Sequence, residues 1–141
     1  MDRLSPEKRS WLMSRVKAKG TGPELAVRRM LHALGYRYRL HSLQLPGKPD
    51  LSFPSRRKIV FVHGCFWHGH EDCRYAKLPL SRVEFWREKI EKNKQRDEKN
   101  FAEMKMLGWD VHVVWQCQLK SSEKVLEDLQ RFLGPPGREN V

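Results

Sequence analysis

The segment from His63 to Cys73 constrains this chain more than any other stretch. Within a few residues (HGCFWHGHEDC) it carries three histidines and two cysteines, side chains that bind soft and borderline metal ions. The third cysteine of the chain, Cys117, follows a strand-like run (DVHVVW). Because this loop is so polar, it has little apolar packing to hold it in place. We therefore expect a metal ion to organise it.

The spacing predicts a closed structural zinc site with three thiolates and one imidazole. Such a set leaves no open coordination position, which is typical of structural rather than catalytic zinc. The expected ligands are Cys65, His70, Cys73 and Cys117. In the alternative interpretation, the cysteines are buried apolar residues and the histidines are polar surface groups. His70 is preferred over His68 as the fourth ligand, because His68 is then free for chemistry.

The charge of the chain favours an anionic partner. Its 141 residues contain 28 Lys and Arg against 17 Asp and Glu, a formal net charge of +11. Residues 1–40 hold ten basic and three acidic residues, so we expect residues 1–20 to form a basic helix or arm along nucleic acid. A solvated basic surface without specificity is the alternative. The sequence shows neither a secretory signal nor an apolar run as long as a membrane span, so we expect a cytoplasmic protein.

The pattern of apolar residues and turn residues predicts an α/β protein with a mixed sheet flanked by helices. We expect a single domain over residues 1–133 and a disordered tail over 134–141. The sequence Ser81-Arg-Val-Glu84 has the form of a capping box that begins a long helix. The helices are expected at about 6–17, 23–34, 81–107 and 122–132, and the strands at 36–40, 50–53, 58–63 and 110–115.

A second group of residues indicates hydrolysis assisted by a divalent metal ion. If 50–53 and 58–63 form a hairpin, Asp50 lies opposite Val62 to within one residue, close to His63. The carboxylate could hold Mg²⁺, and His68 could take a proton from the attacking water. The plainer interpretation is that Asp50 is a turn residue and the histidines are surface groups.

Large aromatic residues occur in and after the Cys/His loop, although a polar loop that binds a metal seldom uses adjacent large aromatics for packing. Phe66 and Trp67 lie inside the Cys/His loop, and Phe85 and Trp86 lie at the start of the long helix, among lysines and arginines. Such a set can stack on bases or wedge into a duplex. Packing around the zinc is the alternative.

Four stretches together resemble the very-short-patch repair (Vsr) endonucleases, over about residues 5–120. They are LPGKPD at 45–50, VFVHGCFWH at 60–68, EFWREKI at 84–90 with Asn93 and Arg96-Asp97, and LGW at 107–109 with VWQC at 114–117. The resemblance implies a restriction-endonuclease-like fold with a structural zinc site. The chain has FVH at 61–63 where ordinary restriction nucleases carry Glu-x-Lys, as this family expects.

The resemblance also implies a function. Such an enzyme is a Mg²⁺-dependent, strand-specific endonuclease that nicks DNA 5′ to the T of a T·G mismatch, left by deamination of 5-methylcytosine. Its expected partner is double-stranded DNA with that mismatch, and we expect a monomer, with mismatch-repair proteins as candidate partners, associated with the bacterial nucleoid. Two alternatives stay open, a restriction-type endonuclease acting on matched DNA and a zinc-stabilised DNA-binding module without catalysis.

Individual roles follow from the matched positions. Asp50 and the backbone carbonyl of Val62 would bind Mg²⁺, and the residues of the catalytic centre would be Asp50, His68, His63, Glu24 and Asp97. The zinc ligands would be those that the spacing already predicts. The residues expected at the DNA are Phe66, Trp67, Trp86, Lys89, Asn93 and Met13.

Overall fold

The computed structural model describes residues 22–136. The expected helix at 6–17, the rest of the basic arm, Met13 and most of the expected tail lie outside these residues. The described chain runs through α2 (Gly22–Ala33), β1 (Arg39–Leu40), β2 (Leu51–Phe53), β3 (Lys58–His63), α3 (Val83–Met106), β4 (Asp110–Trp115) and α4 (Ser122–Leu133). Three short 3₁₀ helices connect them, η1 (Pro54–Arg56), η2 (Arg74–Ala76) and η3 (Gln116–Ser121).

The four strands form one mixed sheet in the order β1-β2-β3-β4. β1 pairs antiparallel with β2, β2 pairs antiparallel with β3, and β3 pairs parallel with β4. The parallel pair needs a crossover, which the long helix α3 provides. The expected hairpin is therefore confirmed, with Leu51 opposite Val60, so that Asp50 precedes β2 beside the end of β3.

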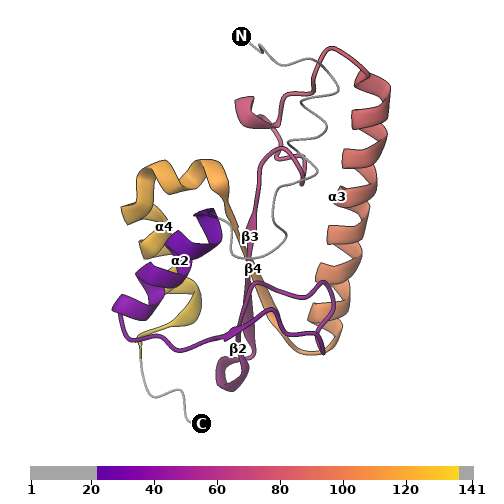
Figure 1. The fold of residues 1–141 in the computed structure, drawn as a ribbon. Coiled ribbons are helices and arrows are strands. Elements are labelled where there is room, and N and C mark those ends of the chain that lie inside the picture. The colour runs from indigo at the N-terminus through magenta and orange to yellow at the C-terminus, as the bar shows by residue number, and fades with distance from the viewer. Residues whose placement is uncertain (1–21, 137–141) are drawn as a thin grey trace.

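Helices cover both faces of the sheet. Figure 1 shows α2 and α4 together on one side and α3 alone on the other. Because side chains alternate along a strand, Val60 on β3 packs toward α2 and α4, whereas Ile59 and Phe61 pack with Met104 of α3. His63 has the same parity as Ile59 and Phe61, so it lies on the α3 side. The expected α/β fold, a mixed sheet flanked by helices, is confirmed.

Two local expectations are wrong. The strand expected at 36–40 is reduced to Arg39–Leu40, because Tyr36 and Tyr38 pack edge-on against Phe53 instead of continuing the ladder. The capping box is also not formed: the N-cap of α3 is Arg82, in a left-handed conformation (φ 57°), and it makes no side-chain capping bond. The helix thus begins one residue too late for Ser81 to cap it.

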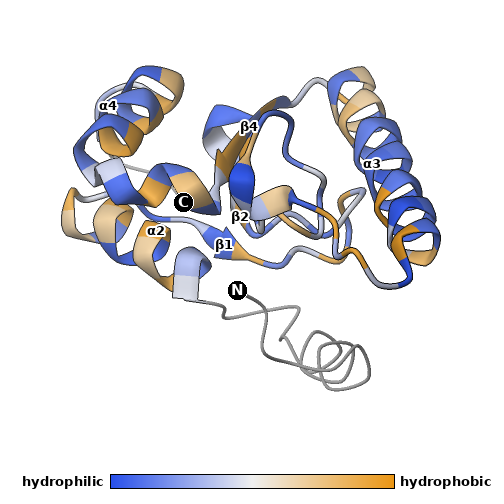
Figure 2. Ribbon diagram, turned by 90° about the horizontal axis from the view of Figure 1, so that it is seen from above, coloured by the Kyte–Doolittle hydropathy of each residue, from blue (hydrophilic) through white to orange (hydrophobic). Residues whose placement is uncertain are grey.

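The helices differ in how much apolar surface they carry. In Figure 2, α3 is largely hydrophilic along its length, while α2 and α4 carry apolar residues on one side. α3 accordingly buries few residues, Trp86, Ile90 and Met104. Among residues 22–136, no helix has both the length and the apolar character needed to cross a membrane.

Candidate active site and metal centre

A cavity of about 610 Å³ lies where the ends of β2 and β3 meet α3. Its lining includes the carboxylate of Asp50 and the rings of His63 and His68, with Asp97 from α3. Lys48 and Arg96 add basic side chains to the same lining. Residues separated by almost fifty positions in the sequence therefore share one polar cavity.

Asp50 is fixed by the backbone of the neighbouring strand. Its Oδ2 accepts a hydrogen bond from the backbone N–H of Val62 at 2.7 Å, and the preceding Pro49 is buried. Burial raises the pKa of Asp50 to about 6, the bond from Val62 opposes that rise, and the nearby Glu24 carboxylate adds to it. A buried carboxylate beside a second one is a strong attractor for a cation.

Glu24 reaches the same region from the first turn of α2. Its side chain is buried, and its carboxylate lies 3.3 Å from the guanidinium of Arg28 and 3.0–3.1 Å from Nε2 of His41. The ligand atoms of Glu24, His41 and Asp50 all lie within 4.8 Å of one another. The apolar face of α2 is packed on the sheet, and this packing places Glu24 under the cavity.

His63 and His68 form a stacked pair. Their ring centroids are 3.7 Å apart and the rings are 6° from parallel. Nδ1 of His68 lies 2.6 Å from Oδ2 of Asp97, while Nδ1 of His63 is buried and has no hydrogen-bond partner within the described residues. Burial lowers the pKa of His63 to about 3, and the charge of the neighbouring His68 acts in the same direction. His63 is therefore neutral at physiological pH.

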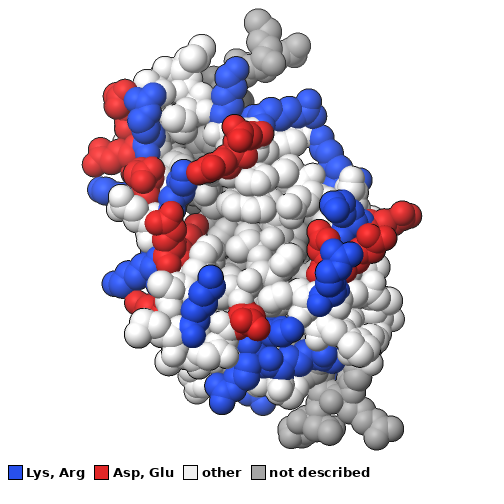
Figure 3. All heavy atoms as spheres, turned by 180° about the vertical axis from the view of Figure 1, so that it is seen from behind, with Lys and Arg blue, Asp and Glu red and all other residues white. Residues whose placement is uncertain are grey.

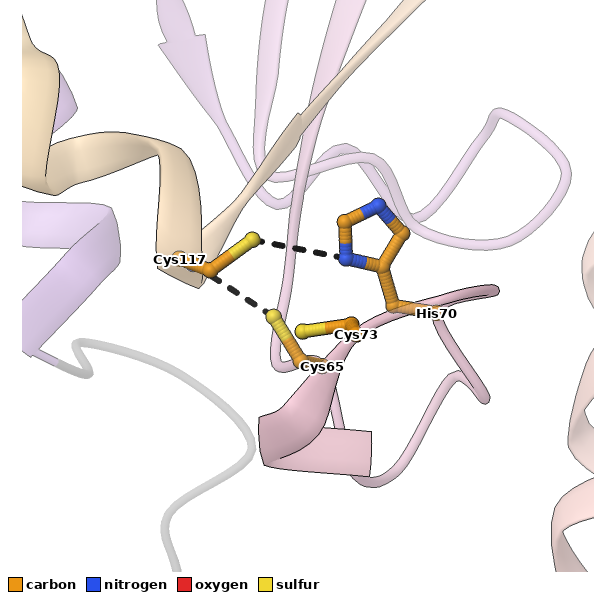
Figure 4. Close-up of side chains that lie close together, drawn as sticks. All are labelled: Cys65, His70, Cys73 and Cys117. Carbon is orange, nitrogen blue, oxygen red and sulfur yellow. Dashed lines mark hydrogen bonds between the residues drawn. The ribbon is translucent and has the colours of Figure 1, made fainter. Parts of the chain in front are cut away.

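The predicted zinc ligands converge just beyond the same C-terminal end of β3, next to the cavity. Figure 4 shows Cys65, His70 and Cys73 of the loop after β3 facing Cys117, which follows β4. Their ligand atoms lie within 4.8 Å of one another, and Sγ of Cys117 is 3.4 Å from Nδ1 of His70. Burial raises the pKa of the Cys65 thiol to about 12, so a thiolate there requires a cation beside it. Three thiols and one imidazole are the donors that zinc prefers, so the set fits a structural zinc ion.

Trp115 lies between the cavity and the predicted zinc ligands and contacts a residue of each. The ring of His70 stacks on it, with centroids 4.1 Å apart and an interplanar angle of 7°. The ring of His63 contacts the same indole edge-on, at 5.2 Å. If the loop that carries Cys65, His70 and Cys73 (the zinc loop) moved, Trp115 would transmit that movement to the stacked histidines.

The predicted DNA-facing aromatics form one cluster. Phe66, Trp67 and Trp86 contact one another edge-on with centroids 5.4–6.0 Å apart, and Phe85 contacts Trp86 at 5.0 Å. Trp86 is only 4% exposed, so it supports the cluster from below, while Phe85 is 45% exposed. Asn93 donates a hydrogen bond to the carbonyl of Trp67 at 2.9 Å, which ties the loop to α3. Lys89 lies exposed on α3.

Comparison with known proteins identifies the family. The family model described as "DNA mismatch endonuclease Vsr" matches residues 1–74. The "Type II nicking enzyme V.XorIIP" of Xanthomonas oryzae is 53% identical over 134 residues, covering 95% of this chain and 98% of that protein. The "DNA mismatch endonuclease Vsr" of Escherichia coli is 38% identical over 120 residues, covering 85% of this chain and 76% of that protein. The chain belongs to the Vsr family.

Membership of the Vsr family makes the chain a DNA mismatch endonuclease by family, a hydrolase with DNA as its substrate. The resemblance drawn from the four sequence stretches is confirmed. A third relative, the "Type II nicking enzyme V.NmeAIP" of Neisseria meningitidis, is 42% identical over 94% of each chain. The relatives thus carry two kinds of name, mismatch endonuclease and nicking enzyme.

Sequence reasoning missed His41 as a functional residue of the Vsr cavity. His41 lines it and contacts Glu24, but it stands alone in the sequence, nine positions before Asp50 and outside any motif. The only signal was its place at the end of a strand-like run that pairs with the strand after Asp50. The structure brings Asp50, His63, His68 and Asp97 to one cavity, and Glu24 has its carboxylate within 4.8 Å of that of Asp50.

The charge of this Vsr chain is mixed over the described surface. In Figure 3, Lys and Arg side chains alternate with Asp and Glu on the face that lies behind Figure 1. No single-sign surface extends over that face of the described residues. The expected basic arm lies mostly outside the described part of the chain, so its contact with DNA stays a prediction.

Proposed function

We propose that this Vsr protein is a Mg²⁺-dependent, strand-specific endonuclease that nicks DNA 5′ to the T of a T·G mismatch. The lesion arises by deamination of 5-methylcytosine, and the nick begins very short patch repair. The observation that carries the proposal is the convergence of Asp50, His63, His68 and Asp97 in one cavity beside an aromatic cluster. The names of the relatives support nuclease chemistry on DNA.

Asp50 and the carbonyl of Val62 would hold the magnesium ion. The donors fit, because Mg²⁺ prefers oxygen ligands and Asp50 is a buried carboxylate whose charge needs a cation. When bound, Mg²⁺ would stabilise the charge that develops on the phosphate and on the leaving 3′ oxygen. The backbone N–H of Val62 fixes the orientation of the Asp50 carboxylate.

His68 is placed to take a proton from the attacking water. Its Nδ1 donates to Asp97, so Nε2 carries the lone pair that accepts the proton. Asp97 then stabilises the imidazolium that forms. Water adds to the phosphorus, the bond to the 3′ oxygen breaks and that oxygen takes a proton from solvent, which leaves a 5′ phosphate and a 3′ hydroxyl.

His63 and Glu24 would support this chemistry from beneath the cavity. His63 stays neutral and holds the ring of His68 by stacking, so that His68 keeps one orientation. Glu24 adds a second carboxylate beside Asp50, which strengthens the attraction for a divalent ion.

The aromatic cluster would supply the preference for a mismatch. Inserting Phe66 and Trp67 into a duplex requires two base pairs to unstack, and a mispair unstacks at lower cost than a matched pair. Trp86 would brace both rings from below, and Lys89 and Asn93 would approach the bases. Met13, on the expected arm, would contact the DNA from the opposite groove.

A second candidate function is sequence-specific nicking of matched DNA. Several relatives are named type II nicking enzymes, among them two that match 94–95% of this chain. This function keeps the metal chemistry and changes only what the aromatic cluster and the arm recognise.

One assay separates these functions. Purified protein with Mg²⁺ is incubated with a pool of duplexes that carry T·G or T·A at one position within randomised flanking sequence. We expect nicks only 5′ to the T of T·G, in the T strand, and none with Asp50→Ala. Nicking of matched duplexes at equal rates would support the second candidate. Binding without cleavage of any duplex, in Mg²⁺ or Mn²⁺, would support a DNA-binding module.

A further inference from the structure

His41 lies beside the catalytic carboxylates although no motif contains it. It follows β1 directly, and its backbone N–H donates to the carbonyl of Asp50 at 3.3 Å. Its backbone is left-handed (φ 45°), a conformation that residues other than glycine rarely adopt and that is often found at functional sites. The side chain is 17% exposed and lines the cavity.

The distances around His41 suit the ligands of one metal ion. Its Nε2 lies 3.0 and 3.1 Å from the two oxygens of Glu24, and the ligand atoms of Glu24, His41 and Asp50 lie within 4.8 Å of one another. In an octahedral site with bonds of about 2.1 Å, adjacent ligand atoms stand about 3.0 Å apart. The closest pair in the cluster already has that spacing.

The surroundings also favour an ion at this place. Glu24 is 1% exposed and faces a second carboxylate, an arrangement that a divalent cation between them stabilises. In the same cavity, Nδ1 of His63 is buried with no hydrogen-bond partner among the described residues. A buried polar atom of this kind points to a water or ligand in the cavity.

We propose that His41 is a nitrogen ligand of the catalytic metal ion, beside the carboxylates of Glu24 and Asp50. The inference rests on the proposed function, because it concerns the metal of that same site. When the ion binds, the proton on Nε2 moves to Nδ1 or is released to solvent. A nitrogen donor favours a transition metal over Mg²⁺, so the site binds Mn²⁺ more tightly than Mg²⁺.

The test is a direct measurement of metal coordination. Zinc-loaded, magnesium-free protein without DNA receives substoichiometric Mn²⁺, and pulsed electron paramagnetic resonance is used to detect ¹⁴N bound to Mn²⁺. Wild type is compared with His41→Gln, which keeps a hydrogen-bonding amide, and with His68→Gln. His32→Gln is the control, because His32 is exposed on the same helix as Glu24.

We expect the ¹⁴N signal in wild type, in His32→Gln and in His68→Gln, and its loss in His41→Gln. Calorimetry should show the Kd for Mn²⁺ raised about tenfold or more in His41→Gln, and the Kd for Mg²⁺ changed much less. Circular dichroism checks that His41→Gln is folded. If it is not, His63→Gln is measured as well, and a signal that persists in both His63→Gln and His68→Gln assigns the nitrogen to His41, the remaining histidine of the cavity.

Three results would overturn the inference. They are a wild-type protein that binds no Mn²⁺ at millimolar concentration, bound Mn²⁺ without a ¹⁴N signal, and a ¹⁴N signal that persists in folded His41→Gln. The mismatch assay is independent of these results. If wild type nicks T·G duplexes and shows no ¹⁴N signal, the inference fails and the proposed function stands. If the ¹⁴N signal depends on His41 and no duplex is cut, the inference about the metal ligand stands and the proposed function fails.

Discussion

The hydrogen bond between His68 and Asp97 decides which nitrogen of His68 can accept a proton. Asp97 occupies Nδ1 at 2.6 Å, and the stack on His63 fixes the plane of the ring. Asp97 lies on α3, 29 residues after His68, and His63 is the last residue of β3. At the residue scale, the chemistry of His68 is therefore set by two neighbours from different elements.

Asp97→Asn should slow nicking without weakening DNA binding. The amide keeps the volume of the carboxylate but cannot stabilise the imidazolium, so we expect the single-turnover rate to fall about 100-fold, within the range of general acid–base catalysis. Fluorescence anisotropy should show unchanged affinity for the duplex. Asp110→Asn, at the exposed first position of β4, is the matched control. An unchanged rate in Asp97→Asn would contradict the role of the pair.

Asp50 makes the metal-free protein less stable at neutral pH. Its pKa is about 6 in the folded protein against 3.8 for an ordinary carboxyl, so the folded state holds the proton more tightly than the unfolded state. The stability from this proton is complete below about pH 4 and is lost as pH rises through 6. Asp50→Asn should therefore raise the free energy of unfolding at pH 8 by up to about 3 kcal/mol.

Urea unfolding of both proteins in chelator at pH 4 and pH 8 checks this. The difference between the two proteins should vanish at pH 4, where the carboxyl is protonated in wild type. Mg²⁺ at pH 8 should stabilise wild type and not Asp50→Asn. A variant that is less stable than wild type at pH 8 in chelator would contradict the cause given for the raised pKa.

At the scale of elements, the loop between β3 and α3 depends on the end of β4. Cys65, His70 and Cys73 lie in that loop, and Cys117 in η3 closes the set. Trp115, two residues before Cys117, contacts both His70 and His63. The Cys/His cluster, the candidate zinc site, therefore joins two segments and lies beside the stacked histidines.

Cys117→Ala should remove the zinc and destabilise the chain. Elemental analysis should find one zinc per wild-type chain and much less in the variant. The free energy of unfolding should fall by several kcal/mol, because binding of a structural zinc ion contributes directly to folding. Nicking should fall with it. Ser121→Ala is the matched control, since Ser121 makes no side-chain capping bond before α4. Wild-type protein purified without zinc and fully stable would refute the assignment.

At the scale of the whole molecule, the aromatic cluster combines the buried ring of Trp86 with rings that are partly or well exposed. Trp86 is buried on α3 and contacts the partly exposed rings of Phe66 and Trp67, which lie in the loop before that helix. Phe66 and Trp67 lie in the same loop as three of the predicted zinc ligands, so the proposed contact with DNA depends on the loop that the zinc would organise.

Trp67→Ala and Trp86→Ala should therefore behave differently. Trp86→Ala should lower the free energy of unfolding by about 3–5 kcal/mol, as expected for a buried tryptophan. Trp67→Ala should change stability much less and should reduce the preference for T·G over T·A in the nicking assay. Urea unfolding and paired rate measurements give both quantities. Equal losses of stability in the two variants would refute this division of roles.

The sequence determined the parts of this protein that depend on local pattern and side-chain chemistry. The apolar run at 58–63 predicts a strand, which forms, and the Cys/His spacing predicts four ligands whose donor atoms lie within 4.8 Å of one another. Asp50 beside Val62 follows from the length of a short hairpin, which allows little freedom of register. The strand and the hairpin succeed because their causes lie within a few residues, whereas Cys117 reaches the other three ligands only because β4 pairs with β3.

Only the tertiary structure decided how distant segments meet. The packing of α2 on the sheet places Glu24 next to His41 and Asp50, and α3 brings Asp97 to His68. The failed capping box at Ser81 shows the same cause, since the path of the loop before α3 overrides a local signal. Such contacts depend on the crossing of helices over a sheet, a geometry set by the whole core, and no single stretch of sequence encodes it.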